Sequence, residues 1–173
     1  MFAGPFFFMS TIPRLTTTPF PRYIFIPGKN PHPKKDGGHM AGLPDPIATP
    51  IDLIHPEKSQ ELRYSIDLYN HGYFWESHVY FEALWNAHGR QGSVADLMKA
   101  FIKLGAAGVK DQINQKTSAL GHLVRAKELL EAVTKAEAQS FLGFELKEMA
   151  SEIDSAIESE TFKIVLNPDW GSR

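Results

Sequence analysis

The sequence predicts an all-α protein: a compact bundle of four to five antiparallel helices with a proline-rich N-terminal arm packed on it. Three observations predict this class. Apolar residues recur at helical spacing between residues 51 and 160. Short polar or glycine-containing stretches separate these periodic segments, which is typical of antiparallel helix pairs. The alternating pattern of a strand occurs only in the short runs RYIFI and FKIVL.

Composition divides the 173-residue chain into four parts. Residues 1–50 contain most of the prolines and show no helical periodicity. We expect residues 1–20 to be a disordered tail and residues 21–50 to be an extended arm that is ordered by lying on the helices. Residues 51–160 are the expected helical domain, and residues 161–173 a C-terminal tail. The start, MFAGPFFFMS, lacks a basic n-region, so we do not expect a signal peptide.

Each expected helix carries its own signal. PEKSQELRYSIDLYNHG has apolar residues at helical spacing, and Gly72 ends or bends it. FWESHVYFEALWNAH is a second amphipathic segment, followed by the turn GRQGS. Ser93 is the expected N-cap of a third helix that runs to about residue 113. Thr117 or Ser118 is the expected cap of a fourth, which runs to about residue 137, and FELKEMASEIDSAIE forms the last.

Composition and charge exclude several classes of protein. The formal net charge of -2 argues against general nucleic-acid binding, which usually requires a basic face. The absence of cysteine excludes disulfides, thiolate nucleophiles and cysteine-ligated zinc, and it fits a cytoplasmic protein. No run approaches the roughly 20 apolar residues of a membrane span, so we expect no membrane partner.

The segment HGYFWESHVYFEALWNAHGR places carboxylates and histidines among aromatic residues, where burying them is costly. Residues three, four and seven apart share a helix face. One stripe therefore contains Phe74, His78, Phe81, Glu82 and Trp85. His78 and Glu82, four residues apart, are close enough to hydrogen-bond or to share a metal. Glu76 lies about 200° around the helix from His78, on another face.

This constellation has two interpretations. In the functional one, Glu82 is a base or a metal ligand, His78 is a proton shuttle or ligand, and Glu76 completes a site between the second, third and fourth helices. The protein would then be a metal-assisted hydrolase. In the structural one, the polar groups satisfy each other and fix the helix register of a non-catalytic module. That module would bind a small molecule or a protein partner, a second copy of the chain included.

The loop YIFIPGKNPHPKKDGGHM contains three more candidate ligands: His32, Asp36 and His39. Three ligands within eight residues of a proline- and glycine-stiffened loop could hold a divalent metal or close the helical site. The five candidate metal ligands are thus His32, Asp36, His39, His78 and Glu82. The spacing H-x3-D-x2-H matches no common zinc pattern. The alternative is an arm that only hydrogen-bonds to the bundle.

The third helix contains FIKLGAAGVK, in which Gly105 and Gly108 flank two alanines. A glycine in mid-helix costs about 1 kcal/mol relative to alanine, so this face is expected to pack tightly, form a pocket floor or carry a homodimer contact. Lys103 and Lys110 share one face of this helix, and His122 begins the next. These three residues either complete the site or form a solvated surface. The weakest hypothesis is nucleic-acid association through Lys34, Lys35, Arg90, Lys103 and Lys110.

The residues from Asn70 to Trp85 resemble the bacterial and archaeal domain-of-unknown-function family numbered 309. That family's pattern is of the kind N-x-G-x-Y/F-x-E-x-H-E-x-x-E-x-x-W. It falls here on Asn70, Gly72, Phe74, Glu76, His78, Glu82 and Trp85, with Val79 where the family usually has glutamate. A subgroup resembles the chain in a loop like YIFIPGKNPHPKKDGGH, although the spacing before His39 is one residue shorter here. The resemblance covers about residues 22–145 and implies a compact helical domain without an assigned activity.

Overall fold

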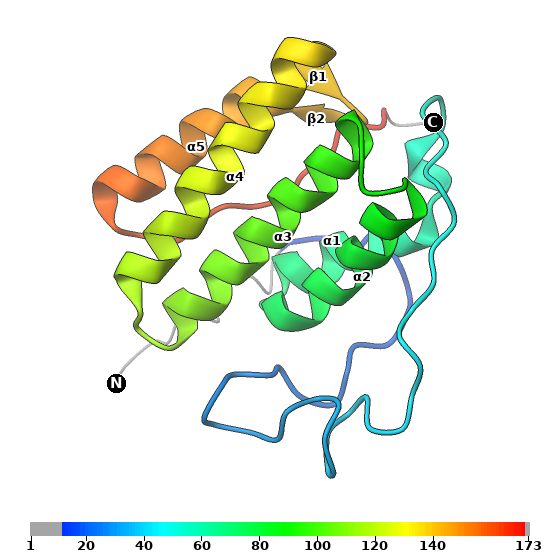
Figure 1. The fold of residues 1–173 in the computed structure, drawn as a ribbon, viewed down its shortest axis with the longest axis vertical. Coiled ribbons are helices and arrows are strands. Elements are labelled where there is room, and N and C mark those ends of the chain that lie inside the picture. The colour runs from blue at the N-terminus through cyan, green and yellow to red at the C-terminus, as the bar shows by residue number, and fades with distance from the viewer. Residues whose placement is uncertain (1–11, 172–173) are drawn as a thin grey trace.

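The computed structural model describes residues 12–171, and structural statements below refer to these residues. The helices, shown in Figure 1, are α1 (Gln60–Asn70), α2 (Phe74–Ala87), α3 (Ser93–Gln112), α4 (Lys116–Ala136) and α5 (Leu146–Ser159). A 3₁₀ turn, η3 (Pro56–Lys58), precedes α1, and two short antiparallel strands, β1 (Ser140–Phe141) and β2 (Phe144–Glu145), join α4 to α5. The predicted all-α class is confirmed.

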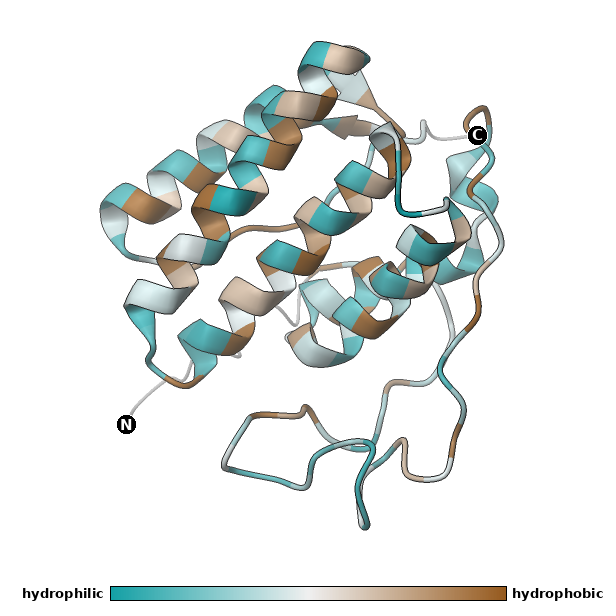
Figure 2. Cartoon of the chain, viewed as in Figure 1, coloured by the Kyte–Doolittle hydropathy of each residue, from teal (hydrophilic) through white to brown (hydrophobic). Residues whose placement is uncertain are grey.

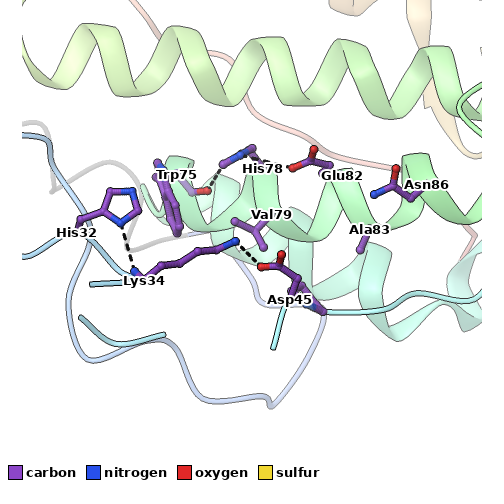
Figure 3. Close-up of a pocket in the computed structure, with 10 residues that line it drawn as sticks. His32, Lys34, Asp45, Trp75, His78, Val79, Glu82, Ala83 and Asn86 are labelled. Carbon is purple, nitrogen blue, oxygen red and sulfur yellow. Dashed lines mark hydrogen bonds and ion pairs between the residues drawn. The ribbon is translucent and has the colours of Figure 1, made fainter. Parts of the chain in front are cut away.

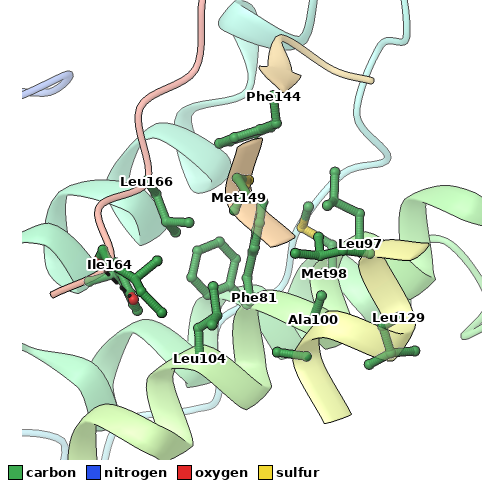
Figure 4. Packing of buried hydrophobic residues seen from close by; sticks show 14 of the residues in the cluster. Phe81, Leu97, Met98, Ala100, Leu104, Leu129, Phe144, Met149, Ile164 and Leu166 are labelled. Carbon is green, nitrogen blue, oxygen red and sulfur yellow. Dashed lines mark hydrogen bonds between the residues drawn. The ribbon is translucent and has the colours of Figure 1, made fainter. Parts of the chain in front are cut away.

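Consecutive helices pack against one another: α1 on α2, α2 on α3, α3 on α4 and α4 on α5. Their inward faces form one hydrophobic core, part of which Figure 4 shows. Near its middle, Phe101 of α3 packs against Phe81 at 5.3 Å and Phe144 at 4.8 Å between ring centroids. Figure 2 shows hydrophobic and hydrophilic residues alternating along α3, α4 and α5, as expected of helices with one buried face. None of the helices described is both long and apolar enough to span a membrane.

The helix ends differ from their expected positions. Ser59 caps α1, since its hydroxyl accepts a hydrogen bond from the Leu62 amide at 3.2 Å. Helix α3 includes Ser93 and has Gly92 as its N-cap, with φ of 88°. That conformation favours glycine, so the backbone of the preceding turn, and not a capping side chain, sets where α3 begins. Helix α4 begins at Lys116 with Gln115 as its N-cap, ahead of the expected caps Thr117 and Ser118. The runs RYIFI and FKIVL form no strands.

The glycines of α3 let α2 approach closely. A Cβ atom added at Gly105 would lie 3.1 Å from the carbonyl oxygen of Phe74, and one added at Gly108 would lie 2.5 Å from Cγ of the Phe74 ring. These two positions are therefore covered by α2 of the same chain. A homodimer contact through them would first have to displace Phe74.

Replacing Gly108 with alanine should lower the free energy of unfolding by about 1–2 kcal/mol, because the clash with the Phe74 ring outweighs the gain in helix propensity. Gly121, in α4, is the matched control: an added Cβ there meets nothing within 4 Å. Gly121→Ala should therefore raise the free energy of unfolding by up to about 1 kcal/mol. Urea unfolding of both variants measures the difference. Equal effects at the two positions would contradict the packing described.

Helix α1 fixes both ends of the described chain. Asp67 holds the N-terminal segment, accepting hydrogen bonds from the amides of Leu15 and Thr16 at 2.7 and 2.9 Å. Asn70 holds the C-terminal segment: it both donates to the carbonyl oxygen of Leu166 and accepts from the Leu166 amide, at 2.8 and 2.9 Å. Residues 12–20 and 161–171 were expected to belong to tails, yet parts of both segments lie against α1. The rest of the expected N-terminal tail, residues 1–11, lies outside the described residues.

Candidate functional site

Helix α2 lies between the bundle and the arm. Phe74 and Phe81 are buried in the core, and Trp85 packs against it. His78 and Glu82 were expected to share the stripe of these three aromatic residues, but their side chains are 32% and 49% exposed. They line a cleft between α2 and the arm, whereas the expected site lay between α2, α3 and α4. The aromatic residues of the stripe thus turn into the core while its polar pair faces outward.

The arm folds into a tight loop that brings His39 to α2. The Met40 amide donates to the carbonyl oxygen of Pro33 at 2.8 Å, and the Gly38 amide to that of Lys35 at 2.8 Å. A Cβ atom at Gly38 would lie 2.2 Å from the Pro33 oxygen, so no other residue fits the turn without moving the backbone. The turn places His39 against α2 and leaves His32 at the edge of the cleft.

His39 and Glu76 form a buried pair. The ring nitrogen Nε2 of His39 donates to Oε1 of Glu76 at 2.8 Å, and the two side chains are 4% and 1% exposed. The amide of Phe25 donates to the same carboxylate oxygen at 2.8 Å. We call this cluster of His39, Glu76 and the Phe25 amide the arm latch, because it joins two points of the arm to one side chain of α2.

Burial raises the pKa of Glu76, and the hydrogen bonds from His39 and Phe25 offset only part of this effect. The second carboxylate oxygen, Oε2, is buried without a hydrogen-bond partner among the described residues, consistent with the direction of the shift. The latch therefore fixes the arm while keeping a carboxyl group in an environment that disfavours its charge.

The cleft has a volume of about 420 Å³. It is lined by His32, Lys34, Asp45, Pro46, Trp75, His78, Val79, Glu82, Ala83 and Asn86. Figure 3 shows His32 and Trp75 at one end and Asn86 at the other. Lys34 and Asp45, which form an ion pair, line the arm side, across from His78 and Glu82 on α2.

Trp75 organises one end of the cleft. Its ring makes edge-to-face contacts with Phe25 at 5.5 Å, with His32 at 5.3 Å and with His78 at 5.4 Å between centroids. Such contacts are each worth about 0.5–1.5 kcal/mol beyond the area they bury. Three neighbours at steep angles hold the indole in one orientation, so this end of the cleft is pre-formed.

The orientation of His78 is set by the helix that carries it. Its Nδ1 lies 2.6 Å from the carbonyl oxygen of Trp75, which can only accept, so Nδ1 carries the hydrogen. In the neutral ring the lone pair is then on Nε2, which lies 3.8 Å from Oε2 of Glu82. A histidine held in this tautomer beside a carboxylate can take up a proton at Nε2 and return it.

The remaining candidate residues do not line the cleft. Asp36 is exposed on the arm. Trp85 packs under Arg90, whose guanidinium is 4.9 Å from the ring centroid. Burial, together with the charges of Lys103 and Lys110, lowers the pKa of His122 on α4. Within residues 12–171, no group of three potential ligands is placed to hold a metal. The five candidate ligands are instead divided among the cleft, the latch and the surface.

Sequence reasoning missed Trp75, Asp45 and Asn86 as lining residues. Trp75 precedes His78 by three positions, so helical geometry could have indicated both the ring contact and the carbonyl acceptor. Asp45 gave no such signal, since its place depends on how residues 33–46 turn back toward α2.

Comparison with known proteins supports the resemblance for the first helices, but not for the arm. Residues 62–122 match the family described as Domain of unknown function (DUF309). This region contains most of α1, all of α2 and α3 and the start of α4, and so the whole α2 wall of the cleft. The arm lies outside it. No curated protein and no solved structure gives a significant match.

Proposed function

We propose that this chain, whose residues 62–122 carry the DUF309 family domain, binds a small polar molecule between the arm and α2, and that His78 exchanges a proton with it. The observation that carries the proposal is the bond from Nδ1 of His78 to the carbonyl oxygen of Trp75, which leaves Nε2 as the basic nitrogen beside Glu82. A pre-formed aromatic end and an amide-bearing end, at Asn86, would orient the bound molecule.

The chemistry that suits this geometry is general acid–base catalysis. Nε2 would take a proton from water or from the ligand, and the Glu82 carboxylate would stabilise the imidazolium that forms. Positioned proton transfer of this kind contributes about 10²- to 10⁴-fold to a rate. Hydrolysis, with water as the nucleophile, is the reaction class we propose. The proposed steps use only the His78 imidazole, the Glu82 carboxylate and water.

The structural interpretation applies to the other His–Glu pair. Glu76 and His39 are buried, bonded to each other and absent from the cleft lining. We therefore propose that Glu76, first considered as a catalytic residue, acts by positioning the arm. The geometry thus favours the functional interpretation for His78 and Glu82 and the structural interpretation for His39 and Glu76.

Replacing His78 with glutamine should lower the rate of p-nitrophenyl acetate hydrolysis by about tenfold or more, because the basic nitrogen is lost. The ester is a generic probe of an available imidazole, and initial rates at pH 7–8 measure its cleavage. His122→Gln removes a histidine from α4, outside the cleft, and should leave most of the rate intact. Dialysis against EDTA should not change it. A His78→Gln rate equal to wild type would refute the proposal.

A further inference from the structure

We infer that the molecule bound in the cleft is a small organic cation, an amine carried on an apolar body. The inference rests on the proposed function and names the class of its ligand. Three features of the cleft lead to it: the balance of charge, an aromatic ring without a cationic partner, and the apolar surface between them.

The charges lining the cleft leave one carboxylate without a cationic partner. Lys34 is the one lysine or arginine in the lining, and it is paired with Asp45. Glu82 lies 3.8 Å from Nε2 of His78, and no lysine or arginine of residues 12–171 forms an ion pair with it. An anionic ligand would find the Lys34 ammonium already neutralised and would lie near the Glu82 carboxylate. A cation would be attracted by that carboxylate.

The indole of Trp75 adds a second preference for positive charge. A cation over a tryptophan ring gains about 0.5–2 kcal/mol, the larger values applying where water is excluded. Trp85 already has this contact, with Arg90 at 4.9 Å and Lys99 at 5.9 Å from its centroid. Trp75 lines the cleft, and the lysine and arginine contacts with aromatic rings among the described residues involve Phe20, Tyr23 and Trp85 but not Trp75. A cation that enters the cleft would therefore meet an indole whose ring neighbours are Phe25, His32 and His78 and not another cation.

The surface between the two groups suits an apolar body. Val79 and Ala83 are buried residues of α2 that contribute to the lining, and they lie on the same helix as Trp75 and Glu82. A volume of about 420 Å³ falls in the lower part of the range for small-molecule sites, roughly 300–1,000 Å³. A single ring or short chain bearing one ammonium group matches this size and this arrangement of charge.

Benzylammonium and benzoate test the inference, because they share a ring and differ in the sign of their charge. Each is titrated into the ¹⁵N-labelled full-length protein at neutral pH, and amide shifts are followed by NMR. Benzylammonium should give saturable shifts in α2 from Trp75 to Asn86 and bind about tenfold or more tightly than benzoate. Glu82→Gln, which keeps the shape of an exposed side chain, should weaken benzylammonium binding by about tenfold. Glu128→Gln, an exposed carboxylate of α4, should not.

Benzoate binding as tight as benzylammonium binding, or a Glu82→Gln variant that keeps wild-type affinity for benzylammonium, would overturn the inference. So would the absence of cleft shifts with either probe. In each of these cases ester hydrolysis that still depends on His78 would leave the proposed function standing. If instead benzylammonium binds as expected but hydrolysis does not depend on His78, the inferred ligand class is supported and the proposed proton transfer fails.

Discussion

Replacing Glu76 with alanine is expected to lower the free energy of unfolding by about 2–3 kcal/mol and to release the arm from α2. The variant would leave the Phe25 amide and the ring N–H of His39 buried without acceptors, at about 1–3 kcal/mol for each group. Release of the arm limits the total loss of stability, because the Phe25 amide and the His39 ring N–H can then hydrogen-bond to water. The arm forms one wall of the cleft, so ligand binding should be lost together with the latch.

Urea unfolding measures the change in stability, and limited trypsin digestion measures release of the arm through cleavage after Lys29, Lys34 or Lys35. Glu82→Ala is the matched control, since it removes an exposed carboxylate from the same helix and should change the stability by less than about 0.5 kcal/mol. An arm in Glu76→Ala that resists trypsin as well as wild type does would show that the latch does not hold it.

Glu76→Gln keeps the shape of the Glu76 side chain but removes its ability to ionise. The amide oxygen of glutamine can still accept from Phe25 and His39, so the arm should stay in place. Because burial raises the pKa of Glu76 in the folded protein, ionisation of this group disfavours folding. Its stabilising effect is complete below the unfolded-state pKa and is lost as the pH rises through the folded-state pKa. Wild type should therefore gain stability relative to Glu76→Gln as the pH falls from 7 toward 4. His39, which faces the carboxyl from the arm, is present in both proteins.

Replacing Asp67 with alanine is expected to lower the free energy of unfolding by about 3 kcal/mol. Its carboxylate, 1% exposed, accepts the amides of Leu15 and Thr16 and the Thr16 hydroxyl, and lies 3.4 Å from Arg14. Removing one side of a buried charge network costs about 3–5 kcal/mol, and the half-exposed position of the N-terminal segment reduces this figure. The loss should appear in urea unfolding.

Thr16→Val provides a graded comparison for Asp67→Ala. It keeps the shape of the side chain and removes only the hydroxyl bond to Asp67, so we expect a loss of about 1 kcal/mol. Hydrogen exchange should show faster exchange of the Leu15 and Thr16 amides in Asp67→Ala. Unchanged protection of these amides would mean that the N-terminal segment is held by contacts other than Asp67.

The helices could be predicted from sequence because each buries one face, and the period of that face is visible in the residues themselves. Their exact ends could not, since Gly92 and Gln115 begin α3 and α4 without a capping side chain. The strands β1 and β2 are two residues each, too short to show an alternating pattern. The attachment of both terminal segments to α1 was invisible for another reason: it is made largely by backbone groups, which every sequence contains.

The site was predictable in part. The pairing of His78 with Glu82 follows from their spacing of four residues on one helix. The pairing of His39 with Glu76 spans 37 residues and depends on a turn that Gly38 alone permits. Local spacing instead grouped His39 with His32 and Asp36, as neighbours in one loop. The structure separates these three, because a tight turn points successive side chains in different directions.

The hold of α1 on both terminal segments has a consequence for the order of folding. Tyr69 and Asn70 bond to Ile164 and Leu166, which follow them by 95 and 96 residues. During synthesis, Tyr69 and Asn70 are made before these partners, so their bonds to them form only after 95 and 96 further residues. Contacts of such separation close large loops and slow folding. Helices α2 to α4 contact their sequence neighbours. We therefore expect α1 to join the C-terminal segment late in folding, after these local contacts have formed.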